Sequence, residues 1–357
     1  EPIQLVHKEV DTPVEVEDIR DVGAEEQGRM IDVCKEREMR RHFKWEQAPL
    51  LRVYLHQRSD EGFQLTLSFH HAIMDGWSLA SMLTEFFQHY WHLLGLNGGA
   101  VPNAPKALYR DFIALEREAQ ESEESREYWL HALADCEITK LPSLVEPGRT
   151  TQPKSIWREN IAINPEVFER LKEVAKQAEV PLKSVLLAAH VRVMSVLNGT
   201  SEVITGLVMN GREEEQDGER VLGLFLNSVP FRMSLEGGSW EELARRTFET
   251  ESEILPHRRY PMAELQRIKG GDPLFDTLFG FLNFHVTSSM KEIEGMQITG
   301  YADVIETDLT LVAAFDVDVD WKRLHLGLMF DETHLNRQQI EAICRYYERA
   351  LESMARE

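Results

Sequence analysis

Two strand-length segments stand out in the pattern of hydrophobic and polar positions near the start of the chain. Residues 49–55 (Pro-Leu-Leu-Arg-Val-Tyr-Leu) are mostly apolar, and residues 64–70 (Gln-Leu-Thr-Leu-Ser-Phe-His) alternate between apolar and polar side chains. A period of two is typical of a strand with one buried face. Asp60, Glu61 and Gly62 lie between the segments and favour a turn. The pattern therefore predicts a β-hairpin.

The spacing of apolar residues changes to that of a helix after Gly76. The apolar positions that follow at helical spacing are Leu79, Met82, Leu83, Phe86, Phe87, Tyr90 and Leu94. Gly95 marks the expected end of this helix. Residues 70–76, with the sequence His-His-Ala-Ile-Met-Asp-Gly, are therefore expected in the loop between a strand and a helix.

The same order of strand, loop and helix is predicted near the other end of the chain. Residues 323–330 alternate as the first segment does, and a polar loop with Asp331, Glu332 and Thr333 follows. Asn336 and Gln339 then form a capping-box pattern at the start of a helix. We interpret the two copies as two related lobes, of which only the first carries a pair of histidines at the start of its loop. The alternative is that a common supersecondary unit occurs twice without a relationship.

The pattern between these copies predicts a mixture of helices and strands. Helices are expected after residues 109–112, from the N-cap Asn164 with Pro165, and over 182–197; strands are expected over 201–208, 274–286 and 309–319. Residues 138–156 are rich in Pro, Thr and Ser and form the best linker. We therefore expect an α+β fold with an N-terminal lobe over residues 1–148 and a C-terminal lobe over 149–357.

Composition and charge narrow the class of protein. The 357 residues are 43% hydrophobic and 28% charged, and their net charge of −22 argues against a nucleic-acid partner. No apolar run reaches the roughly 18 residues of a membrane span. The three cysteines are far apart in the sequence, which favours a reducing, cytoplasmic compartment. The chain starts without an initiator Met, and we expect that it was cut from something longer.

The histidine loop is the strongest indication of chemistry. Because neighbouring strand residues point to opposite faces, His70 is expected to anchor the loop while His71 projects into a cleft. Asp75 is expected to brace the loop through an arginine or a backbone donor, and Gly76 to allow close backbone approach. A zinc site is disfavoured because the two histidines diverge, and no G-x-S-x-G elbow indicates a serine hydrolase. The plain alternative is a buried histidine followed by an Asp-Gly turn.

Several motifs together resemble the condensation domains of nonribosomal peptide synthetases, within the chloramphenicol-acetyltransferase-like superfamily. The segment at 70–78 matches H-H-x-x-x-D-G with a Trp-Ser extension. Further segments that resemble family motifs, in the family's order, are 109–112, 206–212, 221–232, 257–261 and 273–276. One such motif alone is a weak signal, whereas six in order are a specific one.

The resemblance implies a fold of two chloramphenicol-acetyltransferase-like lobes, arranged as a V-shaped pseudo-dimer with a tunnel between them. It implies amide formation between two thioesters held on the phosphopantetheine arms of upstream and downstream carrier proteins, beside an adenylation domain. No cofactor or metal is expected in the domain itself, and neither is a membrane partner. The family's first two motifs are not found in the sequence, so we expect an incomplete first lobe that lacks the arginine partner of Asp75.

The resemblance also assigns roles to residues. His71 is the expected catalytic residue, and His70, Asp75 and Gly76 support its loop. The residues expected either to line the tunnel or to serve structure are Trp77, Asn227, Arg232 and His285. Aspartates replace the histidines in heterocyclisation domains, and epimerisation domains vary the residues after Asp-Gly. A coenzyme A-dependent acyltransferase of the same fold and a catalytically silent carrier-docking module remain as alternatives, and an intact His71 argues against the second.

Overall fold

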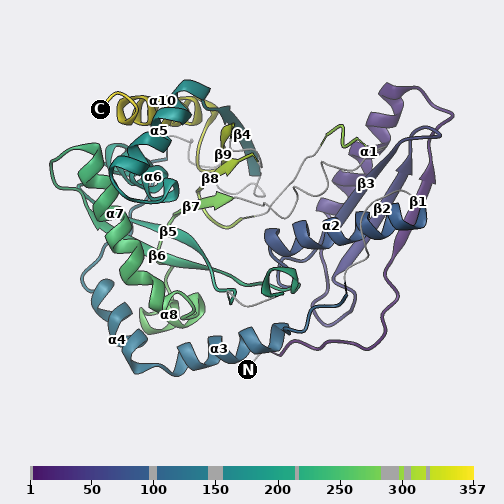
Figure 1. Cartoon of the computed structure of the whole chain (residues 1–357), viewed down its shortest axis with the longest axis horizontal. Coiled ribbons are helices and arrows are strands. Elements are labelled where there is room, and N and C mark those ends of the chain that lie inside the picture. Colours follow the sequence, from purple (N-terminus) through teal and green to yellow (C-terminus); the bar gives the residue numbers. More distant parts are fainter. Residues whose placement is uncertain are drawn as a thin grey trace. The chain divides into compact units, whose positions relative to one another are not determined.

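The computed structural model divides the chain into two compact units. The first contains Glu1–Leu79 and Leu222–Leu224, and the second contains Ala80–Val221 and Phe225–Glu357. Figure 1 shows the chain with its elements labelled. The structure describes residues 3–95, 103–143, 156–213, 217–282, 297–300, 307–318 and 322–357. The expected lobe boundary at 148–149 lies outside these ranges and stays a prediction.

The first unit is built on a three-stranded sheet. Its order is β1 (Val14–Asp18), β2 (Leu51–Gln57) and β3 (Phe63–Phe69), with β1 parallel to β2 and β2 antiparallel to β3. The predicted hairpin is therefore confirmed, with each strand within two residues of its expected bounds. Helix α1 (Ala24–Met39) connects β1 to β2.

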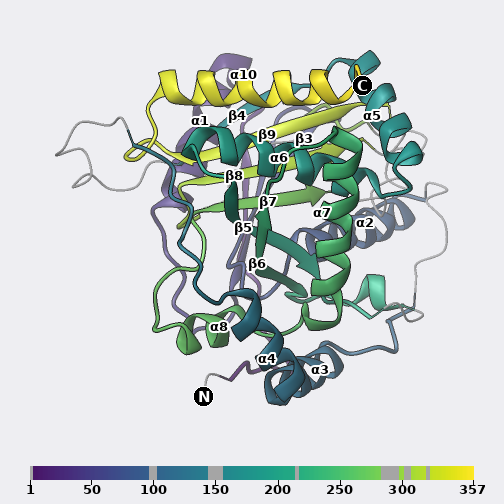
Figure 2. The ribbon, with the colours of Figure 1, turned by 90° about the vertical axis from the view of Figure 1, so that its left-hand side faces the viewer.

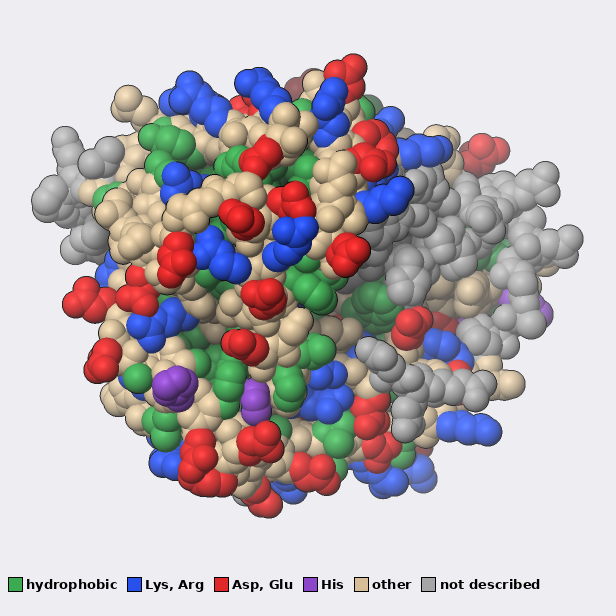
Figure 3. Space-filling view, turned by 60° about the vertical axis from the view of Figure 1, so that its left-hand side comes forward, with side chains coloured by type: hydrophobic (Ala, Val, Ile, Leu, Met, Phe, Trp, Pro, Cys, Tyr) green, Lys and Arg blue, Asp and Glu red, His purple; other side chains and the backbone are tan. Residues whose placement is uncertain are grey.

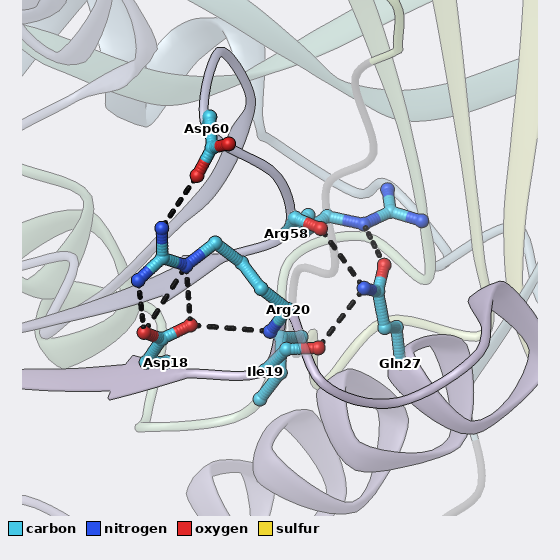
Figure 4. Close-up of polar contacts among 6 residues, drawn as sticks. All are labelled: Asp18, Ile19, Arg20, Gln27, Arg58 and Asp60. Carbon is cyan, nitrogen blue, oxygen red and sulfur yellow. Dashed lines mark hydrogen bonds and ion pairs between the residues drawn. The ribbon is translucent and has the colours of Figure 1, made fainter.

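Polar contacts hold α1 to this sheet. The side-chain N–H groups of Gln27 in α1 donate to the backbone carbonyls of Ile19 (3.0 Å) and Arg58 (2.9 Å). The Arg58 side chain donates in return to the side-chain oxygen Oε1 of Gln27 at 3.2 Å (Figure 4). Beside them, Arg20 pairs with both Asp18 and Asp60 (Figure 4). These bonds fix the start of α1 against the β2–β3 turn.

A buried ion pair joins the other end of α1 to the middle of the sheet. Arg52 of β2 donates to Glu38 of α1 at 2.6 Å, and both side chains are less than a tenth exposed. The Phe43 ring lies 3.8 Å from the Arg52 guanidinium carbon. A buried pair of this kind requires both partners, because removal of one leaves an uncompensated charge in the interior.

The second unit has a six-stranded mixed sheet in the order β4-β9-β8-β7-β5-β6. Its strands are β4 (Ile156–Ala162), β5 (Glu202–Asn210), β6 (Leu226–Ser234), β7 (Thr277–Leu282), β8 (Leu311–Val317) and β9 (Leu324–Asp331). Helices α5 (Pro165–Gln177), α6 (Leu182–Asn198), α7 (Trp240–Ile254) and α10 (Arg337–Met354) cover one face of this sheet (Figure 2). The main hydrophobic core lies between these two layers.

The remaining elements of the second unit are short helices and the body of α2. They are α2 (Gly76–Leu93, of which the first turn belongs to the first unit), α3 (Tyr109–Glu121), α4 (Glu123–Ala132), η2 (Gly218–Arg220), η3 (Leu255–His257) and α8 (Met262–Ile268). Ser122 ends α3 and caps α4, and the three glutamates of the acidic stretch at 121–125 are exposed. Ser125 is buried there and bonds to His257 at 2.9 Å.

The capping signals in the sequence are confirmed. Asn164 accepts the N–H of Glu166 at 2.8 Å at the start of α5. Asn336 accepts the N–H of Gln339 at 2.9 Å, and the Gln339 side chain accepts the N–H of Asn336 at 3.2 Å. These bonds satisfy donors that the first turn of a helix leaves unpaired.

The expectation of a half-buried strand near the C-terminus is wrong. All residues of β9 except His325 are buried. The reason is that β9 lies inside the six-stranded sheet, with helices on one face and a small apolar cluster of Val312, Ala314 and Met329 on the other. The strand expected over 274–286 is described only as β7, since the later residues lie outside the described ranges.

Surface charge and hydropathy complete the picture. In Figure 3 acidic and basic side chains are interspersed over the face of the second unit that is in view, as is usual for a hydrated surface. In the described ranges no single helix is long and apolar enough to cross a bilayer, although α5 and α6 pass that test together as a pair bent by 106°.

Candidate active site

The histidine motif occupies the six-residue loop between β3 and α2, as the sequence predicts. Strand β3 ends at Phe69 and α2 begins at Gly76. The N–H of His70 donates to Leu50 at 3.0 Å and extends the hairpin by one bond. The N–H of Ile73 then donates to the His70 carbonyl at 3.1 Å, which turns the chain.

His70 is a half-buried side chain that is held on several sides. Its Nδ1 accepts the backbone N–H of Ala72 at 3.1 Å. Its ring lies edge-on to Trp45 and Phe43, with centroid distances of 4.7 and 6.3 Å. An imidazole that accepts at Nδ1 carries its proton on Nε2. This geometry suits an anchoring role, which remains the prediction for His70.

His71 is exposed, in contrast to its neighbour. Its ring lies 6.3 Å from the Phe69 ring, tilted by 59°. Neither histidine is part of β3, so their different surroundings come from the loop and not from the alternation of a strand. An exposed imidazole can be reached by a substrate, which is the access that a group acting in acid–base catalysis requires.

Asp75 joins the loop to the helix. The residue is completely buried, and its Oδ1 accepts the N–H of Ser78 at 2.7 Å, so that it caps α2. A carboxylate at this position is favoured by the helix dipole and by the unpaired N–H groups of the first turn. A backbone donor therefore braces Asp75 within this loop, which is one of the two partners expected from the sequence.

A segment far away in the sequence completes the loop. The carbonyl of Gly223 accepts the N–H of Asp75 at 3.0 Å and the hydroxyl of Ser78 at 2.7 Å, and the N–H of Gly223 donates to Ser78 Oγ at 3.0 Å. Gly223 belongs to the motif at 221–232, but nothing in a linear pattern indicates that it meets the histidine motif 145 residues earlier.

The other residues named from the sequence are distributed between the units. Trp77 is half-buried in the first turn of α2. Asn227 lies on β6 in the second unit, where its amide donates to the carbonyls of Arg258 (2.9 Å) and Tyr260 (2.8 Å). Arg232, also on β6, donates to Glu202 (2.6 Å) and to the carbonyl of Ala134 (2.7 Å).

These contacts occupy the polar groups of Asn227 and Arg232 with protein partners. Both residues tie loops to β6, and a role in lining a tunnel stays a prediction for them and for Trp77. His285 lies outside the described residues. The structure thus brings together His70, His71, Asp75, Gly76 and Trp77 on one loop and helix start.

Within the described ranges, neither the cysteines nor any cluster of metal-binding side chains forms a further candidate site. Cys34, Cys136 and Cys344 are free thiols. No group of three or more His, Cys, Asp or Glu side chains among the described residues is arranged to hold a metal ion.

Comparison with known proteins identifies the family. The profile of the family described as "Condensation domain" matches residues 1–357. The chain belongs to the condensation-domain family. It is 33% identical to AMB antimetabolite synthetase AmbE of Pseudomonas aeruginosa over 352 residues. This alignment covers 98% of the chain but only 16% of that protein. The chain therefore spans a small part of the length of its curated relatives.

Solved structures show the same fold. The condensation domain of the monacolin K polyketide synthase MokA is similar with a TM-score of 0.76 and 18% identity, over 96% of this chain and 79% of that one. The epimerization domain from the third module of tyrocidine synthetase B gives a TM-score of 0.74 and 17% identity, over 98% and 80%. Since both kinds of domain match, the fold alone does not distinguish condensation from epimerisation.

Family membership confirms the expected class of chemistry. Condensation domains of nonribosomal peptide synthetases are enzymes that form amide bonds, and this chain is a member of their family. The mixed α/β fold expected from the sequence is confirmed by the same comparisons.

Proposed function

We propose that this domain joins a donor acyl or peptidyl thioester to the α-amine of an acceptor aminoacyl thioester, with His71 as the catalytic residue. The observation that carries the proposal is the contrast within one loop. His71 is exposed, whereas His70 and Asp75 beside it are engaged in hydrogen bonds that hold the loop.

The contribution required of His71 depends on how much of the acceptor amine is already deprotonated. An α-amine has a pKa of about 7.7–8.0 when unperturbed, so roughly a tenth to a fifth of it is already neutral at pH 7. Deprotonation is therefore not the main barrier. Positioning contributes more, because well-oriented partners reach effective molarities worth about 7–11 kcal/mol, whereas acid–base catalysis contributes about 10²–10⁴-fold.

His71 accordingly orients the amine and receives its proton. The nitrogen–carbon bond forms as the amine attacks the thioester carbonyl, the proton passes to the imidazole, and the carbon–sulfur bond breaks. The imidazole then returns the proton to the departing thiolate, so that no other reactant is needed. The N–H of Gly76, in the first turn of α2, is the backbone donor that we assign to the developing oxyanion.

The partners follow from the family. Both substrates arrive on phosphopantetheine arms of peptidyl carrier proteins, one upstream and one downstream, and an adenylation domain that loads the acceptor stands beside the domain. The domain binds no cofactor of its own in this scheme. We place the reaction in the cytoplasm, in keeping with three free thiols.

A single-turnover assay tests the proposal. The full-length synthetase, with defined donor and acceptor carriers loaded, is mixed and the carrier-bound product is measured by mass spectrometry. His71→Ala should lower the rate by about 10²–10⁴-fold. Glu332→Ala, at the corresponding position of the loop between β9 and α10, is the control and should retain the rate. A His71→Ala variant with full activity would contradict the assignment.

The same assay separates the other members of the class. A coenzyme A-dependent acyltransferase would use a free acyl-coenzyme A donor in place of the loaded carrier. A silent docking module would bind both carriers and release no product. An epimerisation domain would change the stereochemistry of a single carrier-bound residue without forming an amide.

A further inference from the structure

The backbone carbonyl and N–H of Gly223 bond to Asp75 and Ser78, at the end of the histidine loop. The Gly223 carbonyl accepts both the N–H of Asp75 and the hydroxyl of Ser78, and the Gly223 N–H donates to that same hydroxyl. Asp75 and Ser78 are both completely buried. The Ser78 hydroxyl therefore uses its donor and an acceptor position on one residue that lies far away in the sequence.

The residues on either side of Leu222–Leu224 are themselves held firmly in the second unit. On one side, Arg212 donates to the carbonyls of Gly218 (2.9 Å) and Val221 (2.7 Å). On the other side, the Phe225 ring packs against Phe112 and Tyr109 at centroid distances of 4.9 and 5.1 Å. Leu222–Leu224 thus follows Val221 and precedes Phe225 in the sequence, and both of these neighbours are held by contacts of their own.

In the segment from His71 to Met74, Met74 is buried, Ala72 and Ile73 are half-buried and His71 is exposed. The described hydrogen bonds of this segment are those from Ala72 and Ile73 back to His70. Asp75 then fixes the end of the loop, and its position depends on the first turn of α2, where its carboxylate accepts the N–H of Ser78 at 2.7 Å. A shift of Ser78 would therefore move Asp75, and with it the backbone that carries His71.

We infer that Ser78 is a positioning residue for His71. Through its bonds to Asp75 and to the backbone of Gly223, Ser78 keeps the His71 imidazole in the position from which it reacts. This inference rests on the proposed role of His71. Misplacement of a reacting group by about 1 Å can lower a rate by about 100-fold even when the change lies outside the reacting groups. Loss of the Ser78 hydroxyl should therefore lower kcat while substrate binding is retained.

Ser81 supplies a matched control. It lies one turn further along α2, it is also buried, and its hydroxyl also donates to a backbone carbonyl of the later segment, that of Glu219 at 3.0 Å. Each alanine variant deletes one buried hydroxyl: Ser78→Ala removes two hydrogen bonds to Gly223, and Ser81→Ala removes one to Glu219. Only Ser78, however, bonds to the residue that also holds Asp75.

The experiment compares Ser78→Ala, Ser81→Ala and His71→Ala in the full-length synthetase with loaded carriers. We expect Ser78→Ala to lower kcat by about 10- to 100-fold with the KM for the loaded acceptor carrier unchanged, and to shift the pH profile of kcat. Ser81→Ala should keep both kcat and the pH profile. Thermal unfolding of the variants shows that both are folded, and Ser78→Cys, of similar volume but with a weak donor, replaces Ser78→Ala if that variant does not fold.

Each other result has a definite meaning. Equal rates for the two serine variants would overturn the positioning role of Ser78, and so would a raised KM with unchanged kcat. If His71→Ala is also fully active, the proposed function itself fails. If only His71→Ala is impaired, the proposed function stands and the inference about Ser78 does not.

Discussion

Two loops of this protein have the same construction and carry different side chains. Residues 70–75 connect β3 to α2, and residues 331–336 connect the end of β9 to α10. In both, the N–H of the fourth residue donates to the carbonyl of the first, at 3.1 Å in one loop and 2.9 Å in the other. The strands before them also agree, since β1-β2-β3 and β7-β8-β9 each combine a parallel pair with an antiparallel pair.

The side chains that shape the two loops correspond position by position. The first side chain accepts the N–H of the third residue, at 3.1 Å for His70 and 2.9 Å for Asp331. The last side chain caps the helix, at 2.7 Å for Asp75 and 2.9 Å for Asn336. This agreement supports the interpretation of two related lobes, since a chance repeat of strand, loop and helix does not require the same internal bonds.

The two loops differ in the side chain at their second position and in the hydrogen bonds that stabilise them. His71 stands where the other loop has Glu332. The second loop is stabilised from within by the Thr333 hydroxyl, which donates to Asp331 at 2.7 Å, and from outside by the Ser143 hydroxyl, which donates to the His334 carbonyl at 2.7 Å. Residues 70–75 of the first loop include no serine or threonine, and the Gly223 carbonyl bonds to the N–H of Asp75 and to the hydroxyl of Ser78 that follows the loop. The shared backbone thus provides a scaffold whose second position carries an imidazole in the first loop and a carboxylate in the second, whereas the histidine of the second loop, His334, lies at the fourth position and contacts Asp331 at 3.3 Å.

The largest expected effect comes from exchanging that residue. His71→Glu places the side chain of the second loop in the first, and it should lower the single-turnover rate by about 10²–10⁴-fold because a carboxylate has the wrong proton affinity for the task. Its stability in urea should change little, since His71 is exposed. Glu332→His is the reciprocal control and should leave the rate as it was. Full activity of His71→Glu would contradict the comparison.

The second effect concerns the helix caps. Asp75→Ala should lower the free energy of unfolding by about 1–2 kcal/mol or more, because a buried cap is lost. Asp75→Asn, which copies the cap of the second loop, should retain most of that stability. Asn336→Ala and Asn336→Asp are the matched pair in the second loop. Urea unfolding with activity measured in parallel is the test, and an Asp75→Ala variant that is fully stable but inactive would show that Asp75 acts in the chemistry and not in the fold.

How far the sequence predicts these features depends on the range of the interaction. The hairpin, the caps at Asn164 and Asn336 and the position of the histidine loop were predictable because they depend on residues within a few positions of one another. The burial of β9 and the burial of Ser125 were not, because both depend on elements from distant parts of the chain. The contact between Ser78 and Gly223 spans 145 positions and has the same explanation.

The smallest effect is expected from acid, and it sharpens the comparison of the first positions. Burial raises the pKa of Asp331, but hydrogen bonds from Thr333 and the neighbouring His334 lower it by more, so that the pKa in the folded state lies below its ordinary value. A depressed carboxyl pKa contributes stability above the pKa of the unfolded chain, and this contribution is lost as the pH falls through the folded value. Asp331→Asn keeps an acceptor for Thr333 without the charge. The free energy of unfolding of the wild type should therefore exceed that of this variant by less than about 1.5 kcal/mol at pH 7, which is the range of one net hydrogen bond. The advantage should shrink below about pH 4, and an advantage in urea unfolding that is constant from pH 7 to pH 3 would show that the charge of Asp331 does not stabilise the second loop.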